Sequence, residues 1–293
     1  MVIVTTLETG QLKFNGLTLG DNVDTFMEEV NGWDDLPPIQ STNAPMAMGH
    51  GSRFGKKYAR ERVITWSGVF QPEDVATWDA KLKAIRAALS VNLTEDDSEI
   101  RIRTHGEELV CYGSVSARAI PGNRSYGSVM LANLSVQFIC ADPRRYSPTM
   151  VNFDIGLPDG LSGGLTYPLT YPLEYGVAAS GGYGTFLNEG DAPLPGVFTV
   201  TSPIESPSIH NDTTSRFVSF NIDLADGETL VIDVKNGTVI LNGTTDRLYT
   251  KTITSSPLGL MELQPGNNLL RASAASWSAG ANISLSAPAG AYF

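Results

Sequence analysis

The residue pattern of the chain changes near residue 150, and this change constrains the fold more than any other feature. Before it, strand-like segments surround one helical pattern and end in the apolar stretch from Val136 to Cys140. After it come a Gly/Pro/Tyr-rich stretch and then β-type alternation without a convincing helix. Because a single core stops growing at roughly 250–300 residues, 293 residues suit two domains. We predict a first domain over 1–150, a linker over 151–185 and a second domain over 186–293.

The first domain is predicted to be β-rich with one helix packed on a sheet or open barrel. Apolar residues spaced by three and four predict the helix over residues 72–89, and Pro72 suits its first turn. β-Branched and aromatic content predicts strands on both sides of it. The apolar stripe comprises Val75, Trp78, Leu82, Ile85 and Leu89, and the strands are expected over 63–70, 91–94, 99–103, 108–119 and 128–140.

The second domain is predicted to be a two-sheet β-sandwich of jelly-roll type. Residues 197–201 and 230–234 alternate between apolar and polar side chains, as half-buried strands do. Asn236-Gly237 and Asn242-Gly243 are strong hairpin signals that follow such runs. Strands at short spacing with turns between them are typical of sandwiches and barrels.

Charge and cysteine content exclude several classes of protein. The net charge is −11, and residues 151–293 carry 5 basic and 13 acidic side chains, so sequence-independent nucleic-acid binding there is disfavoured. Two cysteines, Cys111 and Cys140, are too few for a disulfide scaffold, and their strand-like surroundings predict buried thiols. The sequence shows no signal peptide and no apolar run long enough for a membrane span, so we expect synthesis in a cytoplasm and no membrane partner.

A search for catalytic, cofactor and metal motifs finds none that is specific. His50, His105 and His210 are isolated, and no nucleophile elbow, phosphate-binding loop or cysteine pair for a metal is present. Carboxylate pairs such as Asp96-Asp97 are more often solvated loop residues than glycosidase acids. Asp223, Asp226 and Glu228 lack EF-hand spacing, so a turn is favoured over a calcium site. We predict no enzyme activity, no cofactor and no metal.

The order of segments along the chain resembles that of the distal tail protein (Dit) family of long, non-contractile-tailed bacteriophages, also described as phage minor tail proteins. The segment from Phe138 to Tyr146, which ends the first domain, carries most of this resemblance. The other matching segments are Leu12 to Gly16, Met48 to Gly51, Arg62 to Gly68, the helix over 72–89, the Tyr-Pro linker, Leu187 to Pro193, Gly227 to Asp233 and Leu263 to Asn268.

The resemblance implies a specific architecture and role. The first domain would be split-barrel-like and form a six-fold ring, and the second would be a galectin-like β-sandwich. The ring would be the hub at the distal end of the phage tail, joining the tail tube protein to a tail-tip or tail-associated (Tal-like) protein. Viral DNA would pass through its lumen without sequence readout. Residues 186–293 leave no room for the carbohydrate-binding insertions of some family members, so direct host binding is less supported.

A basic run over 53–62 and the strands over 108–140 are the segments best suited to reach a neighbouring subunit. A closed ring joins two different patches of one subunit, so such extensions are expected contacts. The alternatives are a solvated hairpin for the basic run, and a carbohydrate-binding module or a secreted hydrolase for the chain. The candidate inter-subunit residues are Arg53, Lys56, Lys57, Tyr58, Arg60, Arg62, Arg118, Arg124 and Tyr126, and the candidate docking residues of the linker are Tyr167, Tyr171 and Tyr175.

Overall fold

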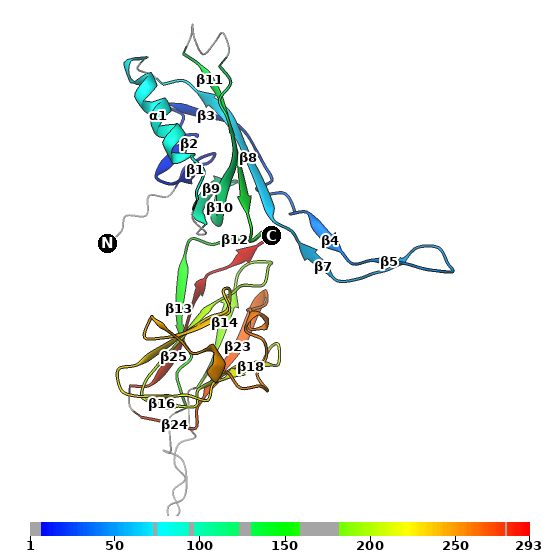
Figure 1. Ribbon diagram of the computed structural model, residues 1–293, viewed down its shortest axis with the longest axis vertical. Helices are drawn as coiled ribbons and strands as arrows, with labels where there is room; N and C mark the ends of the chain where they lie inside the picture. The colour runs from blue at the N-terminus through cyan, green and yellow to red at the C-terminus, as the bar shows by residue number, and fades with distance from the viewer. Residues whose placement is uncertain (1–6, 73–74, 94–96, 123–129, 159–181, 279) are drawn as a thin grey trace, which may run out of the picture. The chain divides into compact units, whose positions relative to one another are not determined.

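The computed structural model describes residues 7–72, 75–93, 97–122, 130–158, 182–278 and 280–293. It divides into two compact units, Met1–Pro148 together with Phe293, and Thr149–Tyr292. Both consist mainly of antiparallel strands, and the described residues hold one α-helix, in the first unit (Figure 1). The predicted fold class, mostly β with one helix in the N-terminal domain, is confirmed.

In the first unit, one long strand links two groups of strands. Residues at the start of β10 (Glu107–Ala119) pair with β9 (Ser98–Thr104), which pairs with β1 (Leu12–Phe14) and so with β2 (Leu17–Leu19). The end of β10 pairs with β11 (Ala132–Cys140), followed by β8 (Arg62–Phe70) and β3 (Thr25–Asn31). The short strand β12 (Arg145–Tyr146) also pairs with β10.

The core of this unit follows the period-two pattern of its strands. Every second residue of β8 is buried, and the register places Ile64 opposite Phe138 and Trp66 opposite Val136. Gly68 is required in this row, because a Cβ there would lie 2.6 Å from the Trp66 ring and 2.3 Å from the Phe26 carbonyl oxygen.

The helix α1 (Trp78–Ala88) covers this core, preceded by the 3-10 turn η1 (Val75–Thr77). Its buried residues Trp78, Leu82 and Ile85 are those of the predicted stripe, and the Trp78 ring lies 4.8 Å from that of Phe70. The α-helix starts later than predicted, and the strand predicted over 91–94 is wrong for 91–93, which have no regular structure.

The second unit contains two larger sheets and one small sheet. The order of the six-stranded sheet is β13-β25-β15-β20-β21-β22, that of the four-stranded sheet is β14-β23-β17-β18, and that of the small sheet is β19-β16-β24. The strand bounds are β13 (Met150–Asp154), β14 (Tyr183–Asn188), β15 (Val197–Thr201), β16 (Ile204–Glu205), β17 (Ser208–Asn211), β18 (Arg216–Ser219), β19 (Asp223–Leu224), β20 (Thr229–Asp233), β21 (Thr238–Leu241), β22 (Thr245–Asp246), β23 (Gly266–Ser273), β24 (Ser276–Trp277), β25 (Asn282–Pro288) and β26 (Ala291–Tyr292). Two 3-10 turns, η2 (Leu248–Thr250) and η3 (Leu258–Leu260), lie between β22 and β23.

Apolar side chains join the two larger sheets. The Phe153 ring of β13 meets the Phe186 ring of β14 edge-on at 6.2 Å.

Both ends of the predicted linker, 151–154 and 183–185, lie in strands β13 and β14 of this unit. The predicted Asn-Gly hairpins are present, since Gly237 and Gly243 adopt positive φ between β20, β21 and β22. The galectin-like description of the sandwich stays a prediction.

Candidate inter-subunit arm

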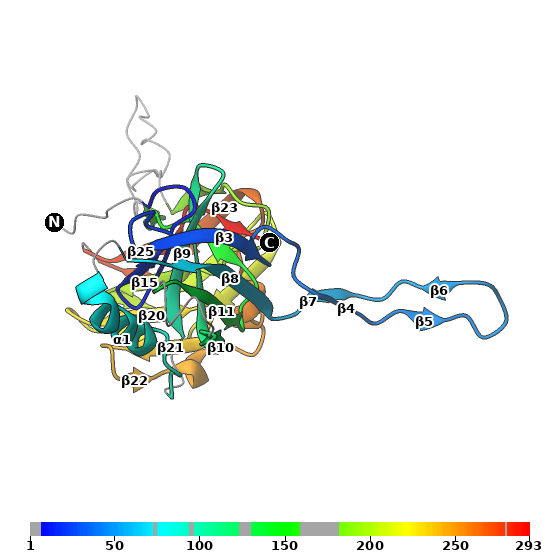
Figure 2. The ribbon, with the colours of Figure 1, turned by 90° about the horizontal axis from the view of Figure 1, so that it is seen from above.

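Residues 36–61 of the first unit form an arm that extends away from its sheet (Figure 2). Near its base, β4 (Ile39–Ser41) pairs with β7 (Lys57–Ala59), and near its tip β5 (Ala44–Pro45) pairs with β6 (Ser52–Arg53). Each pair stands alone as a two-stranded ribbon, and nearly all of its side chains are exposed. A two-stranded ribbon is marginally stable by itself in water, so the arm gains little stability from its own strand pairs.

The arm combines positive charge with exposed apolar side chains. Residues 39–60 include four basic and no acidic residues. Large apolar groups lie among them, with Phe54 83% exposed and Met48 fully exposed, together with Ile39, Met46 and Tyr58. Contiguous apolar groups rimmed by charge mark interaction surfaces more often than free surface.

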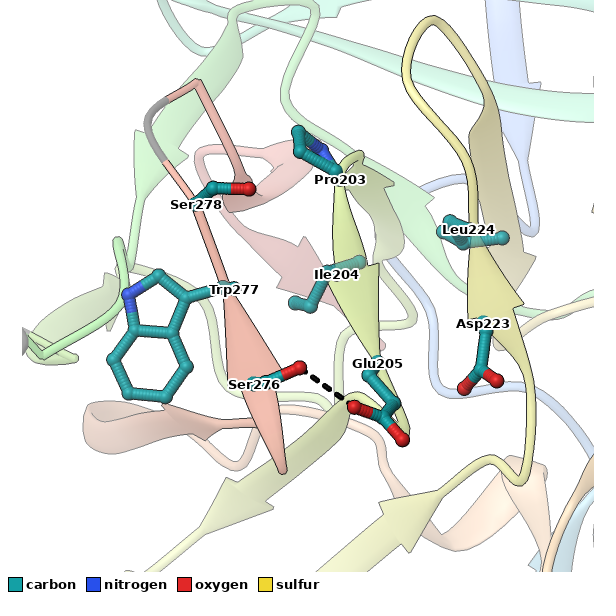
Figure 3. Close-up of a pocket in the computed structure, with 8 residues that line it drawn as sticks. All are labelled: Pro203, Ile204, Glu205, Asp223, Leu224, Ser276, Trp277 and Ser278. Carbon is teal, nitrogen blue, oxygen red and sulfur yellow. Dashed lines mark hydrogen bonds between the residues drawn. The ribbon is translucent and has the colours of Figure 1, made fainter.

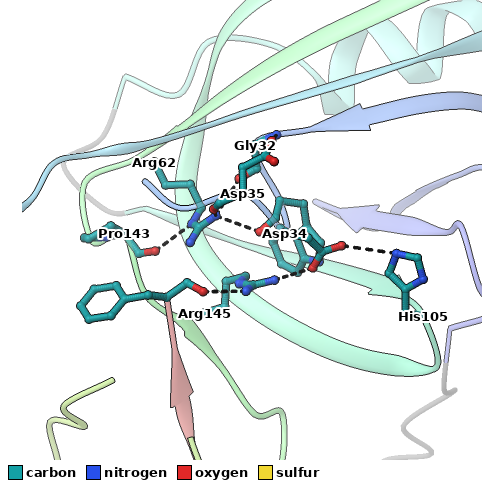
Figure 4. A network of polar contacts seen from close by, with 9 residues as sticks. Gly32, Asp34, Asp35, Arg62, His105, Pro143 and Arg145 are labelled. Carbon is teal, nitrogen blue, oxygen red and sulfur yellow. Dashed lines mark hydrogen bonds and ion pairs between the residues drawn. The ribbon is translucent and has the colours of Figure 1, made fainter. Parts of the chain in front are cut away.

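A buried arginine fixes the base of the arm. Arg62 is 1% exposed, and its Nη1 donates to the carbonyl oxygens of Gly32, Trp33 and Asp35 at 2.7–2.8 Å, while Nε donates to that of Pro143 at 2.8 Å (Figure 4). Burial, followed by the positive charge of Arg145, lowers the pKa of the Arg62 guanidinium. One side chain thus ties the chain before the arm to the start of β8 and to the loop after β11.

A second arginine extends this network. Arg145 donates from Nη1 to Asp34 Oδ1 at 2.7 Å and from Nη2 to the Phe293 carbonyl at 2.8 Å, and it stacks over the Trp33 ring (Figure 4). Phe293 also lines an apolar hollow of about 200 Å³ at the arm base with Leu36, Ile39 and Tyr58. The arm therefore leaves the unit from a rigid base.

The strand next to the arm base carries the opposite charge. β3 ends the order of paired strands in the part of the first unit that the structure describes, so one of its edges is open. Residues 21–35, which include β3, hold six acidic and no basic residues. Phe26, Met27, Glu28 and Glu29 are exposed on β3. Asp24 and Asp34 are ion-paired with Lys81 and Arg145, and Glu28 and Glu29 lie exposed beside Phe26 and Met27. This surface therefore combines apolar and negative groups, whereas the arm combines apolar and positive ones.

The structure separates the sequence-predicted contact residues into three groups. Arg53, Lys56, Lys57, Tyr58 and Arg60 lie exposed on the arm. Arg62 is buried at the base of the arm instead. Arg118 of β10 donates to the carbonyl oxygens of Arg86 at 2.5 Å and Leu89 at 3.1 Å, at the end of α1, where a cation stabilises the helix terminus. Lying outside the described residues are Arg124, Tyr126, Tyr167, Tyr171 and Tyr175.

Sequence reasoning included Tyr58 but missed the other exposed apolar residues of the arm, Ile39, Met46, Met48 and Phe54, as contact residues, and it missed the acidic strand β3. The signal that could have found them is the uneven distribution of charge over residues 21–60, where six acidic residues precede a stretch with only basic ones.

A second candidate surface is an open groove of about 420 Å³ in the second unit (Figure 3). It lies on the small sheet, where the Ser276 hydroxyl donates to Glu205 at 2.6 Å and Asp223 is the strand neighbour of Glu205. The half-buried Trp277 also lines it. Phe198 and Phe220 of this unit are in the core, whereas Tyr183 and Tyr249 are exposed.

The part of the chain that the structure describes contains neither a metal-binding cluster nor a membrane-spanning helix. No group of three or more His, Cys, Asp or Glu side chains is arranged to hold a metal ion among these residues. Within the same ranges, no helix is long and apolar enough to cross a membrane.

Comparison with known proteins shows what the chain is similar to. Residues 189–284, which make up most of the second unit, match the family described as siphovirus-type tail component, C-terminal domain. The first relative of known structure is the Dit protein (gp 19.1) of SPP1, described as a paradigm of the hub adsorption apparatus in phages that infect Gram-positive hosts. It shares 13% identity with this chain at a TM-score of 0.64, and the match covers 97% of this chain and 99% of that one.

Two further solved structures are more distant. Chains of the phage p2 baseplate in its activated conformation, with Ca and with Sr, share 9% identity at TM-scores of 0.48 and 0.49, and cover 90% and 94% of this chain and 91% and 97% of theirs. No curated protein gives a significant match. The family match and the fold shared with SPP1 Dit confirm the predicted resemblance to the siphophage distal tail proteins.

Proposed function

We propose that this chain is the structural hub at the distal end of a long, non-contractile phage tail. Six copies form a ring that joins the tail tube protein to a tail-tip or tail-associated (Tal-like) protein, and viral DNA passes through the lumen without sequence recognition. The chain is made in the host cytoplasm and acts in the virion, without enzymatic activity. The family matched by residues 189–284 and the fold shared with SPP1 Dit support a tail role.

The observation that carries the ring is the complementarity between the arm and β3. The arm is basic and apolar, and the surface around β3 is acidic and apolar. A cyclic ring joins two different patches of one subunit, which these two surfaces provide. We infer that the arm of one copy docks beside β3 of the next. Exposed apolar residues such as Phe54 and Phe26 would then be buried, while the charges set direction and register.

Charge reversal tests this docking. Lys56→Glu with Lys57→Glu makes an arm-reversed chain, and Glu28→Lys with Glu29→Lys makes a strand-reversed chain. We expect each alone to remain monomeric in mass photometry under conditions where the wild type forms rings. Mixed in equal amounts, the two chains should form rings again, because each reversed arm then meets a reversed strand in alternating order.

The matched control reverses two exposed basic residues outside both surfaces, Lys13→Glu and Arg216→Glu, and should leave ring formation unchanged. High salt should weaken the wild-type ring, since exposed ion pairs are screened. A wild-type chain that stays monomeric, or reversed chains that assemble alone, would contradict the proposal.

A second candidate function is saccharide binding by the second unit, for adsorption to the host surface. The groove favours it, because its lining includes the indole ring of Trp277 as well as the polar groups of Glu205 and Ser276. A glycan array with the wild-type chain and Trp277→Ala tests this. Binding that the substitution abolishes would support it, and no binding at millimolar glycan would reject it.

A further inference from the structure

The two cysteines of the chain lie in contact inside the first unit. Cys111 of β10 and Cys140 at the end of β11 are both fully buried, and their Sγ atoms are 3.3 Å apart. They are separated by 29 positions in the sequence. Two thiols at this separation are near the approach that a disulfide needs, whereas most pairs of buried cysteines are not.

A glycine leaves room for the sulfur atom of Cys140. Gly113 lies two residues beyond Cys111 on the same face of β10, and a Cβ there would be 2.8 Å from Cys140 Sγ and 2.5 Å from the Ile139 carbonyl oxygen. At this point β10 also changes partner, from β9 at Gly113 to β11 at Ser114. The absent side chain lets Cys140 reach diagonally across the strands to Cys111.

We propose that Cys111 and Cys140 are an oxidation site that forms an intramolecular disulfide once the chain leaves a reducing cytoplasm. The oxidant is a small-molecule disulfide. One thiolate attacks it and releases one small thiol, and the second protein thiolate then attacks the mixed disulfide and releases the other. Two protons leave the cysteines, and two electrons pass to the oxidant. The only new bond in the protein joins the two Sγ atoms.

The environment makes this reaction slow in both directions. Burial, with the hydrogen bond to Cys140, raises the pKa of the Cys111 thiol, so few molecules hold a thiolate at neutral pH. The buried sulfur atoms are also shielded from reductants. We therefore expect the pair to stay reduced through brief exposure to oxidant and, once joined, to resist reduction.

The cross-link would act next to the base of the arm. Cys140 pairs with Arg62 across β11 and β8, and Arg62 holds the chain before the arm. Joining Cys140 to Cys111 would prevent β11 from separating from β10 beside this anchor. The geometry of the thiol pair does not depend on the proposed function. The expectation that the disulfide forms in the virion does rest on it, since a tail hub works outside the cell, where structural disulfides persist.

Oxidised glutathione tests the proposal on the purified chain. After incubation, protein unfolded in the presence of a thiol-reactive polymer should show both thiols lost together, and intact mass should fall by two hydrogens without a glutathione adduct. The melting temperature should rise on the order of 10 °C relative to the reduced chain. Dithiothreitol added after unfolding should restore both free thiols and the original mass.

Cys111→Ser and Cys140→Ser provide the matched variants and should show no rise in melting temperature with oxidant. If either fails to fold, the comparison of reduced with oxidised wild type still decides the question. Thiols that both stay free, a lasting glutathione adduct or disulfides between chains would overturn the proposal. Ring formation is measured in the same samples, so a monomer with the internal disulfide would refute the proposed function and leave this inference intact.

Discussion

Arg60 and Arg62 are two positions apart but have opposite environments. Arg60 is exposed on the arm, whereas Arg62 is buried and donates to four backbone carbonyls. The residue pattern contains the reason, because Arg62 shares the phase of Ile64, Trp66 and Phe70 on β8 and therefore points inward. Grouping it with the basic run by charge alone missed this phase.

Replacing Arg62 should destabilise the first unit strongly. Arg62→Leu leaves the carbonyls of Gly32, Trp33, Asp35 and Pro143 buried without a donor, and we expect a loss of about 3–5 kcal/mol in the free energy of unfolding. Arg62→Lys keeps the positive charge but cannot donate from several nitrogen atoms of a planar group, so the loss in the free energy of unfolding should be smaller than for Arg62→Leu but still measurable. Urea unfolding measures both, and Arg60→Leu is the control, expected within about 0.5 kcal/mol of wild type.

His210 should make the second unit less stable at mildly acidic pH. Burial, followed by the positive charge of Arg271, lowers its pKa from 6.5, and Asp212 opposes this only in part. Because the folded state binds the proton less well than the unfolded chain, stability is full above pH 6.5 and falls as the pH drops through the lower folded value. The neutral ring stacks on Phe217 at 5.4 Å and contacts Ser208 Oγ at 2.9 Å.

Hydrogen exchange of strands β17 and β18 between pH 7 and pH 5 measures this effect after correction for intrinsic exchange. His210→Gln should remove most of the pH dependence in this window, since His210 is the only histidine after residue 150. If exchange in the His210→Gln chain depended on pH as strongly as in the wild type, other groups would be the cause.

At the scale of elements, long and strongly patterned segments were predictable, and short or edge segments were not. The predicted strands over 63–70, 99–103 and 108–119 agree closely with β8, β9 and β10, because alternation of buried residues determines them. β3 escaped prediction, since its exposed residues Phe26 to Glu29 follow no buried–exposed alternation. The arm was visible only as charge, because its strands bury no face and so leave no apolar period.

The outer part of the arm should be dispensable for folding and necessary for assembly. Replacing residues 43–55 by Asn-Gly closes the ribbon between Thr42 and Lys56 with a two-residue turn. The removed side chains are exposed, so the melting temperature should change little, while ring formation in mass photometry should be lost. Met48→Ser with Phe54→Ser keeps every charge and should weaken the ring through its apolar contacts alone. Full assembly by the shortened chain would exclude the arm as a contact.

At the scale of the whole molecule, the change of pattern near residue 150 predicted two units, and their boundary falls at Pro148 and Thr149. Phe293 belongs to the first unit, where it accepts a hydrogen bond from Arg145, a contact that spans 148 positions of sequence and leaves no local pattern from which it could be predicted. The charge contrast between the arm and β3 is visible in residues 21–60 of the sequence, but which of these residues are exposed on an arm and on an edge strand is a property of the folded chain.

The central claim is that this chain functions through contacts between copies around a hole. Negative-stain electron microscopy of the purified wild-type chain tests it most directly. The account predicts closed six-fold rings with an open centre that disappear in the arm-reversed chain and return when the strand-reversed chain is added. Isolated monomers at micromolar concentration, or rings indifferent to these substitutions, would contradict it.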